Sequence, residues 1–178
     1  MASSVSAWSP PPSASLVSHL TATIWGMTGT SQETPFAPAQ DGTAAATGHV
    51  SVRVLLHSDD ITTRDAVRAA LGRRPAKDVE IVSWRECATA DAVIEAVEAG
   101  GLDLLILDGE AAKLGGLGLC RQLKSEVLGC PPVLVLTGRP QDGWLATWSM
   151  ADAHVPHPVD PIVLADAVAA LARGVAGR

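Results

Sequence analysis

The chain has 178 residues and a formal net charge of −6 at pH 7, and hydrophobic residues make up 47% of it. This length suits one folded domain with an added segment. The acidic balance argues against a nucleic-acid surface, which needs clustered Lys and Arg, and no stretch approaches the roughly 18 uninterrupted apolar residues of a membrane span.

The first segment, residues 1–49, is of low complexity and rich in Ser, Pro, Ala, Thr and Gly. Such a composition buries too little apolar surface to offset chain entropy, so we expect no regular structure from it alone. Two interpretations remain open. It is a leader with incidental hydrophobic residues, or it orders against a larger partner with Trp8 and Trp25 as anchors. We favour the second interpretation.

From Val50 onward, apolar runs alternate with helical patterns. Strands are expected at 52–56, 79–84, 102–108, 133–137 and near 154–155. Helices are expected at 62–71, from a Thr89 cap to 99, from a Gly-rich loop to about 128, at 142–150 and from Pro161 to about 172. This alternation predicts a doubly wound, five-stranded parallel sheet with helices on both faces, an α/β/α sandwich of the flavodoxin-like kind that occupies residues 50–178.

Asp108 ends the most apolar of these runs, which begins at Leu102. A run of this kind is typical of a central strand buried on both faces. The carboxyl ends of parallel strands form the rim where doubly wound folds bind their ligands. We therefore expect Asp108 to be a functional carboxylate at this rim.

The order of several motifs is similar to that of response-regulator receiver domains over residues 51–173. An acidic pair, Asp59-Asp60, follows the first strand, and Thr137 and a Pro158 turn follow the fourth and fifth strands. The stretches 62–68 and 116–121 resemble the first helix and the Gly-Leu-x-Leu-Cys-Arg helix start of that family. Each motif alone is weak, but the set in this order is specific.

The resemblance implies a role for each matching residue. Asp108 matches the phospho-acceptor and Thr137 the switch hydroxyl, while His154 and His157 stand at two further switch positions. Asp59 matches the direct metal ligand, and Glu110 the residue whose backbone carbonyl completes the metal shell. The implied cofactor is Mg²⁺, a hard cation that prefers oxygen ligands and neutralises charge during phosphoryl transfer.

Several departures fall on the switching residues. Ser58 stands where the family has another acid, so Mg²⁺ should bind weakly. His157 replaces the pairing lysine and carries no permanent charge at pH 7. His154 replaces the rotating aromatic, and Arg139 is a candidate to compensate at the pocket mouth. This distribution indicates an intact scaffold with a weakened switch.

Simpler interpretations stay open for these residues. Asp59 and Asp108 could be structural carboxylates, Thr137 could simply end a strand, and the two histidines could be ordinary loop residues without the spacing of a zinc site. Trp144 and Trp148 share a face of the fourth helix. We expect one of them to pack inward, and we place Trp148 on a partner-binding surface with Trp144 as a second candidate.

The predicted function is that of an atypical, orphan single-domain receiver of actinobacterial type. It would be a protein-docking or accessory subunit, not an enzyme, with weakened or lost phosphorylation. Because the chain ends soon after the fifth helix, output should pass through protein contact. The resemblance extends to receivers linked to respiratory NADH dehydrogenase, which suggests that complex as the partner.

Two alternatives remain. The chain could be an active phosphorelay acceptor, with Asp108 phosphorylated in a Mg²⁺-dependent way. A nucleotide- or flavin-binding enzyme is disfavoured because the acidic loop at 57–60 would repel phosphate. Three cysteines without metal-ligand spacing (Cys87, Cys120 and Cys130) and the absence of Lys or Arg before Arg53 predict a cytoplasmic protein, associated with a membrane complex through its partner if at all.

Overall fold

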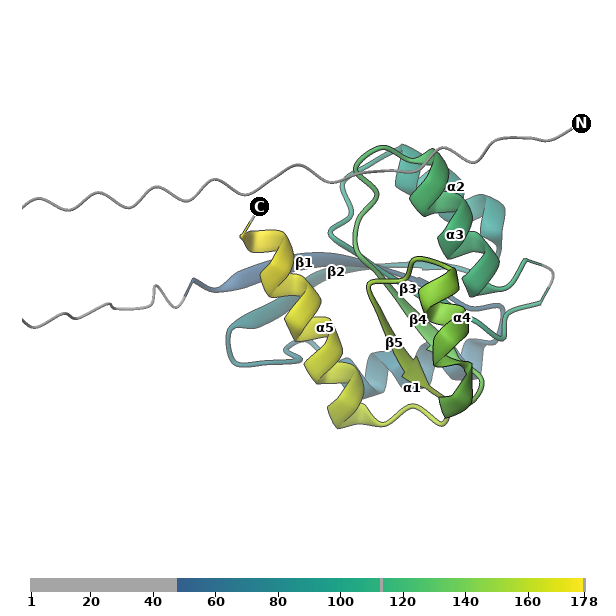
Figure 1. Cartoon of the computed structure of the whole chain (residues 1–178). Coiled ribbons are helices and arrows are strands. Elements are labelled where there is room, and N and C mark those ends of the chain that lie inside the picture. Colours follow the sequence, from purple (N-terminus) through teal and green to yellow (C-terminus); the bar gives the residue numbers. More distant parts are fainter. Residues whose placement is uncertain (1–47, 113, 178) are drawn as a thin grey trace, which may run out of the picture. The chain divides into compact units, whose positions relative to one another are not determined.

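Five parallel strands form one sheet in the order β2-β1-β3-β4-β5 (Figure 1). The computed structural model describes residues 48–112 and 114–177, so the anchors proposed at Trp8 and Trp25 lie outside the described residues. The strands are β1 Val50–His57, β2 Val79–Cys87, β3 Leu104–Asp108, β4 Val133–Thr137 and β5 Ala153–Pro156. The helices are α1 Ile61–Leu71, α2 Ala90–Glu98, α3 Gly116–Glu126, α4 Gly143–Trp148 and α5 Pro161–Ala176, with a short 3₁₀ turn at Pro140–Asp142.

Helix ends follow from local side-chain chemistry. Asp60 caps α1 by accepting a hydrogen bond from the Thr62 amide, and Thr89 caps α2 by accepting one from Ala92. After α1 the chain turns at Gly72, whose φ of +55° favours glycine. These caps fix the directions in which the helices leave the rim of the sheet.

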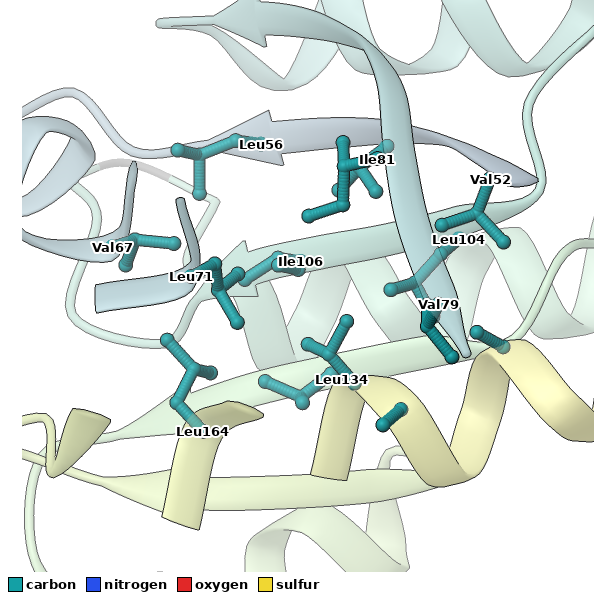
Figure 2. Packing of buried hydrophobic residues seen from close by; sticks show 14 of the residues in the cluster. Val52, Leu56, Val67, Leu71, Val79, Ile81, Leu104, Ile106, Leu134 and Leu164 are labelled. Carbon is teal, nitrogen blue, oxygen red and sulfur yellow. The ribbon is translucent and has the colours of Figure 1, made fainter. Parts of the chain in front are cut away.

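The core has two halves because successive strand residues point to opposite faces of the sheet. On one face, Leu56, Ile106 and Leu134 pack with side chains of α1 and α5 (Figure 2). On the other face, Leu55 and Leu105 pack with side chains of α2 and α3. Every residue of β3 and β4 is buried, as expected for central strands covered on both sides.

This architecture confirms the predicted doubly wound α/β/α sandwich with the strand order of flavodoxin-like folds. The predicted bounds of β4 are correct, while β1 and β2 are longer than expected and α4 is shorter. Within the described residues, none of the helices has the length and apolar content needed to span a bilayer. Two of the three thiols are buried, and burial raises the pKa of Cys120 to about 11, so this thiol is unreactive.

Candidate functional site

The carboxyl ends of β1, β3 and β4 bring Ser58, Asp108 and Thr137 to one rim, and all three side chains are buried. The loop after β5 joins them, because the His157 amide donates a hydrogen bond to the Thr137 carbonyl at 2.7 Å. The peptide between His157 and Pro158 is cis. The predicted site residues thus meet at the ligand-binding edge of a doubly wound sheet.

Asp108 is only 3% exposed, and both of its carboxylate oxygens accept hydrogen bonds. The Ser58 hydroxyl donates to Oδ2 at 2.7 Å, and the Glu110 amide donates to Oδ1 at 3.0 Å. These bonds to an ionised group are of the stronger kind. They satisfy a carboxylate that would otherwise be costly to bury.

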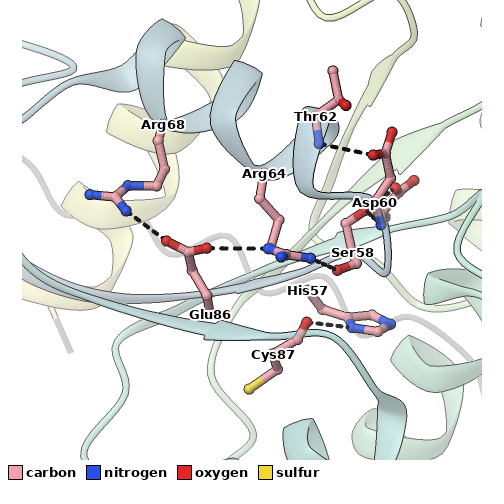
Figure 3. Close-up of polar contacts among 9 residues, drawn as sticks. His57, Ser58, Asp60, Thr62, Arg64, Arg68, Glu86 and Cys87 are labelled. Atoms are coloured by element: carbon pink, nitrogen blue, oxygen red, sulfur yellow. Dashed lines mark hydrogen bonds and ion pairs between the residues drawn. The ribbon is translucent and has the colours of Figure 1, made fainter.

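Hydrogen bonds fix both the side chain and the backbone carbonyl of Ser58. Its hydroxyl oxygen accepts a bond from the Asp60 amide at 3.1 Å, and its carbonyl accepts one from Arg64 Nη1 at 2.6 Å. Arg64 is in turn paired with Glu86, so its charge is already partnered (Figure 3). The hydroxyl of Ser58 is therefore fixed against Asp108 instead of rotating freely.

Asp60 caps α1 and is not the candidate metal ligand. Its carboxylate accepts bonds from the Thr62 amide and the Thr63 hydroxyl. The bond from the Thr62 amide is the largest cause that lowers the pKa of Asp60 below its usual value. This assignment agrees with Asp59, the preceding residue, as the candidate metal ligand.

The oxygen donors at this rim suit Mg²⁺ in type, because Asp59, Asp108 and the Glu110 carbonyl are hard ligands. However, Asp59 Oδ2 already accepts a bond from the Ala112 amide at 3.1 Å, and both oxygens of Asp108 are engaged. Within residues 48–112 and 114–177, no three His, Cys, Asp or Glu side chains are grouped as a metal would require. The residues fit a Mg²⁺ ion that must compete with hydrogen bonds inside the chain.

His157 stands close to the acceptor without bonding to it. Its Nε2 lies 3.6 Å from Asp108 Oδ1, beyond hydrogen-bond distance, and its side chain is 27% exposed. Neither this nitrogen nor the buried Thr137 hydroxyl has a hydrogen-bond partner among the described residues. Buried polar groups are normally paired, so these two are available to a ligand.

The other switch candidates lie at the edge of the site. His154 is exposed, and its ring packs so closely against Gly143 that a Cβ there would lie 2.9 Å from Nε2. Arg139 forms an ion pair with Asp142 at 3.5 Å. Its compensating role at the pocket mouth stays a prediction.

The two tryptophans of α4 both lie on the surface. Trp144 is 66% exposed and Trp148 is 50% exposed. The prediction that one packs inward is wrong, because α4 is short and its inward position is taken by Ala146. The Arg121 guanidinium stacks over Trp148 at 4.7 Å from the ring centre, a favourable cation–π distance.

His57 is a buried residue that the sequence analysis did not single out. It is 2% exposed and its Nδ1 bonds to the Cys87 carbonyl at 3.0 Å (Figure 3). The sequence signal for its burial was the two-residue alternation of side chains along a strand, because residue 57 points to the same face of β1 as Leu55.

The fold and this rim define a receiver-type domain, in which an aspartate ends the third strand. No family model matches the chain. An uncharacterized response regulatory protein of Mycobacterium tuberculosis is 52% identical over 126 residues, 71% of this chain and 95% of that protein. The chain belongs to the response regulator family and carries its receiver domain, the module of two-component signalling.

Two further similarities agree with this assignment. The response regulator protein PmrA of Pseudomonas aeruginosa is 34% identical over 129 residues, 71% of this chain and 55% of that protein. The signal receiver domain of a histidine kinase from Syntrophus aciditrophicus is similar in structure, with a TM-score of 0.58 and 24% identity over 70% of this chain and 92% of that one. The structural likeness supports the fold alone.

Proposed function

We propose that this receiver works as a protein-docking module with weakened phosphorylation. The observation that supports the proposal best is the buried hydrogen bond from Ser58 to Asp108 at 2.7 Å. A hydroxyl here occupies the acceptor oxygen and supplies no charge to a metal. An acid at the same position would hold Mg²⁺ instead.

The charge balance of the pocket supports the same conclusion. Phosphoryl transfer depends on cations that neutralise the transferred group. His157 is an imidazole 3.6 Å from Asp108, and Arg64 is engaged by Glu86 and the Ser58 carbonyl. Apart from a weakly held Mg²⁺, these two described residues offer no free permanent positive charge to a phosphoryl group on Asp108.

The docking surface that we propose is the α4 face, defined as Trp144, Trp148 and Met150. All three are exposed, at 66%, 50% and 43%. Large aromatic side chains near an arginine are typical of residues that carry binding energy at interfaces. In our proposal, the segment 1–49 with Trp8 and Trp25 is a second arm, and the partner is a larger assembly such as respiratory NADH dehydrogenase.

Labelling with acetyl phosphate and Mg²⁺ tests the weakened switch. The wild-type chain should be labelled weakly or not at all, while the double variant Ser58→Asp/His157→Lys should be labelled strongly on Asp108. Adding Asp108→Ala to the double variant serves as the control and should abolish its label. Stable labelling of the wild-type chain that disappears in Asp108→Ala would overturn the proposal.

Capture of NADH dehydrogenase from detergent-solubilised membranes tests the docking surface. Trp144→Ala/Trp148→Ala and deletion of residues 1–49 should each reduce capture, while Asp108→Ala should not. Leu128→Ala is the matched control, because Leu128 is fully exposed and lies outside the α4 face. Equal capture by all variants would exclude both surfaces.

A second candidate function is that of an active phospho-acceptor. Asp59, Asp108 and Thr137 keep the identities that this chemistry needs, and the Thr137 hydroxyl, which has no hydrogen-bond partner in the described part of the chain, is available to a phosphoryl oxygen. The labelling experiment separates the two functions.

A further inference from the structure

A cation on α3 lies directly beside the α4 face. The Arg121 guanidinium stands over the Trp148 ring at 4.7 Å from its centre, and Nη1 donates a hydrogen bond to the Trp148 carbonyl at 2.5 Å. Arg121 is exposed. Contacts with both the ring and the carbonyl restrict the guanidinium, so less freedom is left to lose when a ligand binds it. The charge is therefore held in place next to an exposed aromatic ring.

Arg121 differs from most arginines of this fold in its lack of a carboxylate partner. Every other arginine that the structure describes, apart from Arg85, forms an ion pair with an aspartate or a glutamate. Among the described residues, the only acceptor for the guanidinium of Arg121 is the Trp148 carbonyl. A guanidinium presents five N–H donors in a planar fork that matches a carboxylate. Arg121 thus has donors left for a carboxylate from another molecule.

The backbone at Met150 is a second unusual feature of the α4 face. Its φ is +62°, and no other residue except glycine has a positive φ in the part of the chain that the structure describes. The remaining positive values belong to Gly72, Gly100, Gly101 and Gly129. A helix that ends in this conformation favours glycine, because a Cβ there is strained. Met150 is 43% exposed, so its side chain does not offset the strain by filling the core. Strain kept at an exposed side chain indicates a role at the surface.

These features together favour one kind of ligand. Trp144, Trp148 and Met150 offer an apolar surface, and Arg121 adds one charge with a defined direction of approach. Tryptophan, methionine and arginine are the residue types enriched where proteins meet. An anionic lipid surface is a poorer match, because the whole chain carries a net charge of −6 and would be repelled by it. A protein segment with a carboxylate between apolar side chains satisfies both the charge and the apolar surface.

We propose that the α4 face and Arg121 together bind a carboxylate-bearing apolar segment of a protein partner. The carboxylate pairs with Arg121, and the neighbouring apolar side chains of the segment pack on Trp148 and Met150. This inference rests on the proposed docking function for the existence of a partner. The chemistry of the surface can be tested without that partner.

The probe is a blocked peptide, acetyl-Leu-Asp-Leu-Leu-amide, titrated into the full chain. Nitrogen-15 spectra follow the indole N–H of Trp148 and the Nε–H of Arg121, and both signals should shift until the probe saturates. The twin peptide with asparagine in place of aspartate should bind about two- to fivefold more weakly, as expected for an exposed ion pair. Added salt should remove this difference, because it screens exposed charges.

One pair of variants tests the charge. Arg121→Gln should lower the affinity for the acidic peptide to that for its asparagine twin. The matched control is Arg85→Gln, which removes the same charge from the other described arginine without an ion pair. Arg85 lies on β2, at the edge of the sheet opposite to β5, so this control should leave both affinities unchanged.

A third variant tests the strained residue. Met150→Gly removes the side chain and relieves the backbone, so the melting temperature should rise or stay the same. The affinity for both peptides should nevertheless fall by about two- to fivefold, because part of an apolar side chain is no longer covered on binding. A residue with a purely structural role would not combine these two effects.

Several results would overturn the inference. They are equal binding of the two peptides at low salt, unshifted Trp148 and Arg121 signals at saturation, equal losses in Arg121→Gln and Arg85→Gln, and a lower melting temperature in Met150→Gly. Binding to vesicles of phosphatidylcholine and phosphatidylglycerol, or self-association, that is lost in Trp144→Ala/Trp148→Ala would assign the face to a membrane or to a second copy instead. If the peptides behave as expected while NADH dehydrogenase is not captured, the choice of partner fails and this inference stands.

Discussion

Replacing Ser58 by aspartate tests how closely this residue controls the acceptor. The wild-type hydroxyl donates to Asp108 Oδ2 at 2.7 Å, and both residues are buried. Ser58→Asp removes this donor and places a second carboxylate beside the first. We expect a large loss of stability without Mg²⁺ and a partial recovery with it.

The magnitude follows from two contributions. Loss of a hydrogen bond to a charged group costs about 1.5–3 kcal/mol. Two carboxylates about 4 Å apart repel by about 4 kcal/mol at an effective dielectric constant of about 20, although uptake of one proton by the pair limits this penalty. Together they predict that the free energy of unfolding falls by about 3–5 kcal/mol. Of this loss, about 2.7 kcal/mol should be recovered when Mg²⁺ is present at about 100 times its Kd.

Urea unfolding at pH 7, with EDTA or with Mg²⁺, measures both changes. Ser58→Ala is the matched control, since it loses the hydrogen bond and adds no charge, and it should lose about 1.5–3 kcal/mol without gaining any dependence on Mg²⁺. If Ser58→Asp were as stable as Ser58→Ala in EDTA and did not respond to Mg²⁺, the close approach of residue 58 to Asp108 would be refuted.

Three further predictions concern the scaffold. The guanidinium of Arg173 lowers the pKa of Asp78 from 3.8 to about 2, so the stability that this pair adds should be complete above about pH 4 and lost as the pH falls to 2. The free energies of unfolding of wild type and Asp78→Asn, measured with urea across that pH range, should converge at the acid end. A difference that stays constant with pH would exclude the Asp78–Arg173 pair as the source of the difference. Leu56→Ala, at a fully buried position, should cost about 2–5 kcal/mol in the same assay, and a loss near zero would mean that this half of the core is loosely packed. Gly116→Ala should destabilise strongly, because its Cβ would lie 2.5 Å from the backbone oxygen of Asp108, and a wild-type melting temperature would show that this approach is not rigid.

The sequence predicted the elements of the sheet because their signals are local. The apolar run that ends at Asp108 and the Thr89 cap act within a few residues, and both predictions are confirmed. The meeting of Ser58 with Asp108 could be anticipated only through the family resemblance, since the two residues are 50 positions apart.

The errors concerned side chains whose burial is decided by tertiary packing. Both tryptophans of α4 are exposed because the helix is too short to present a second inward position. His57 was overlooked because the alternation that places it on the same face of β1 as Leu55 was applied to apolar residues alone.

The anchoring of Arg64 on the carbonyl oxygen of Ser58 has a consequence for how this receiver could change. A carbonyl is common to all residues, so this one anchor of the turn after β1 does not depend on the side chain at position 58. An ancestor could exchange an acid for a hydroxyl there without loosening the loop. At this position the side chain serves the reaction and the backbone carbonyl holds the loop. A change of side chain can therefore alter the reaction while the fold is retained.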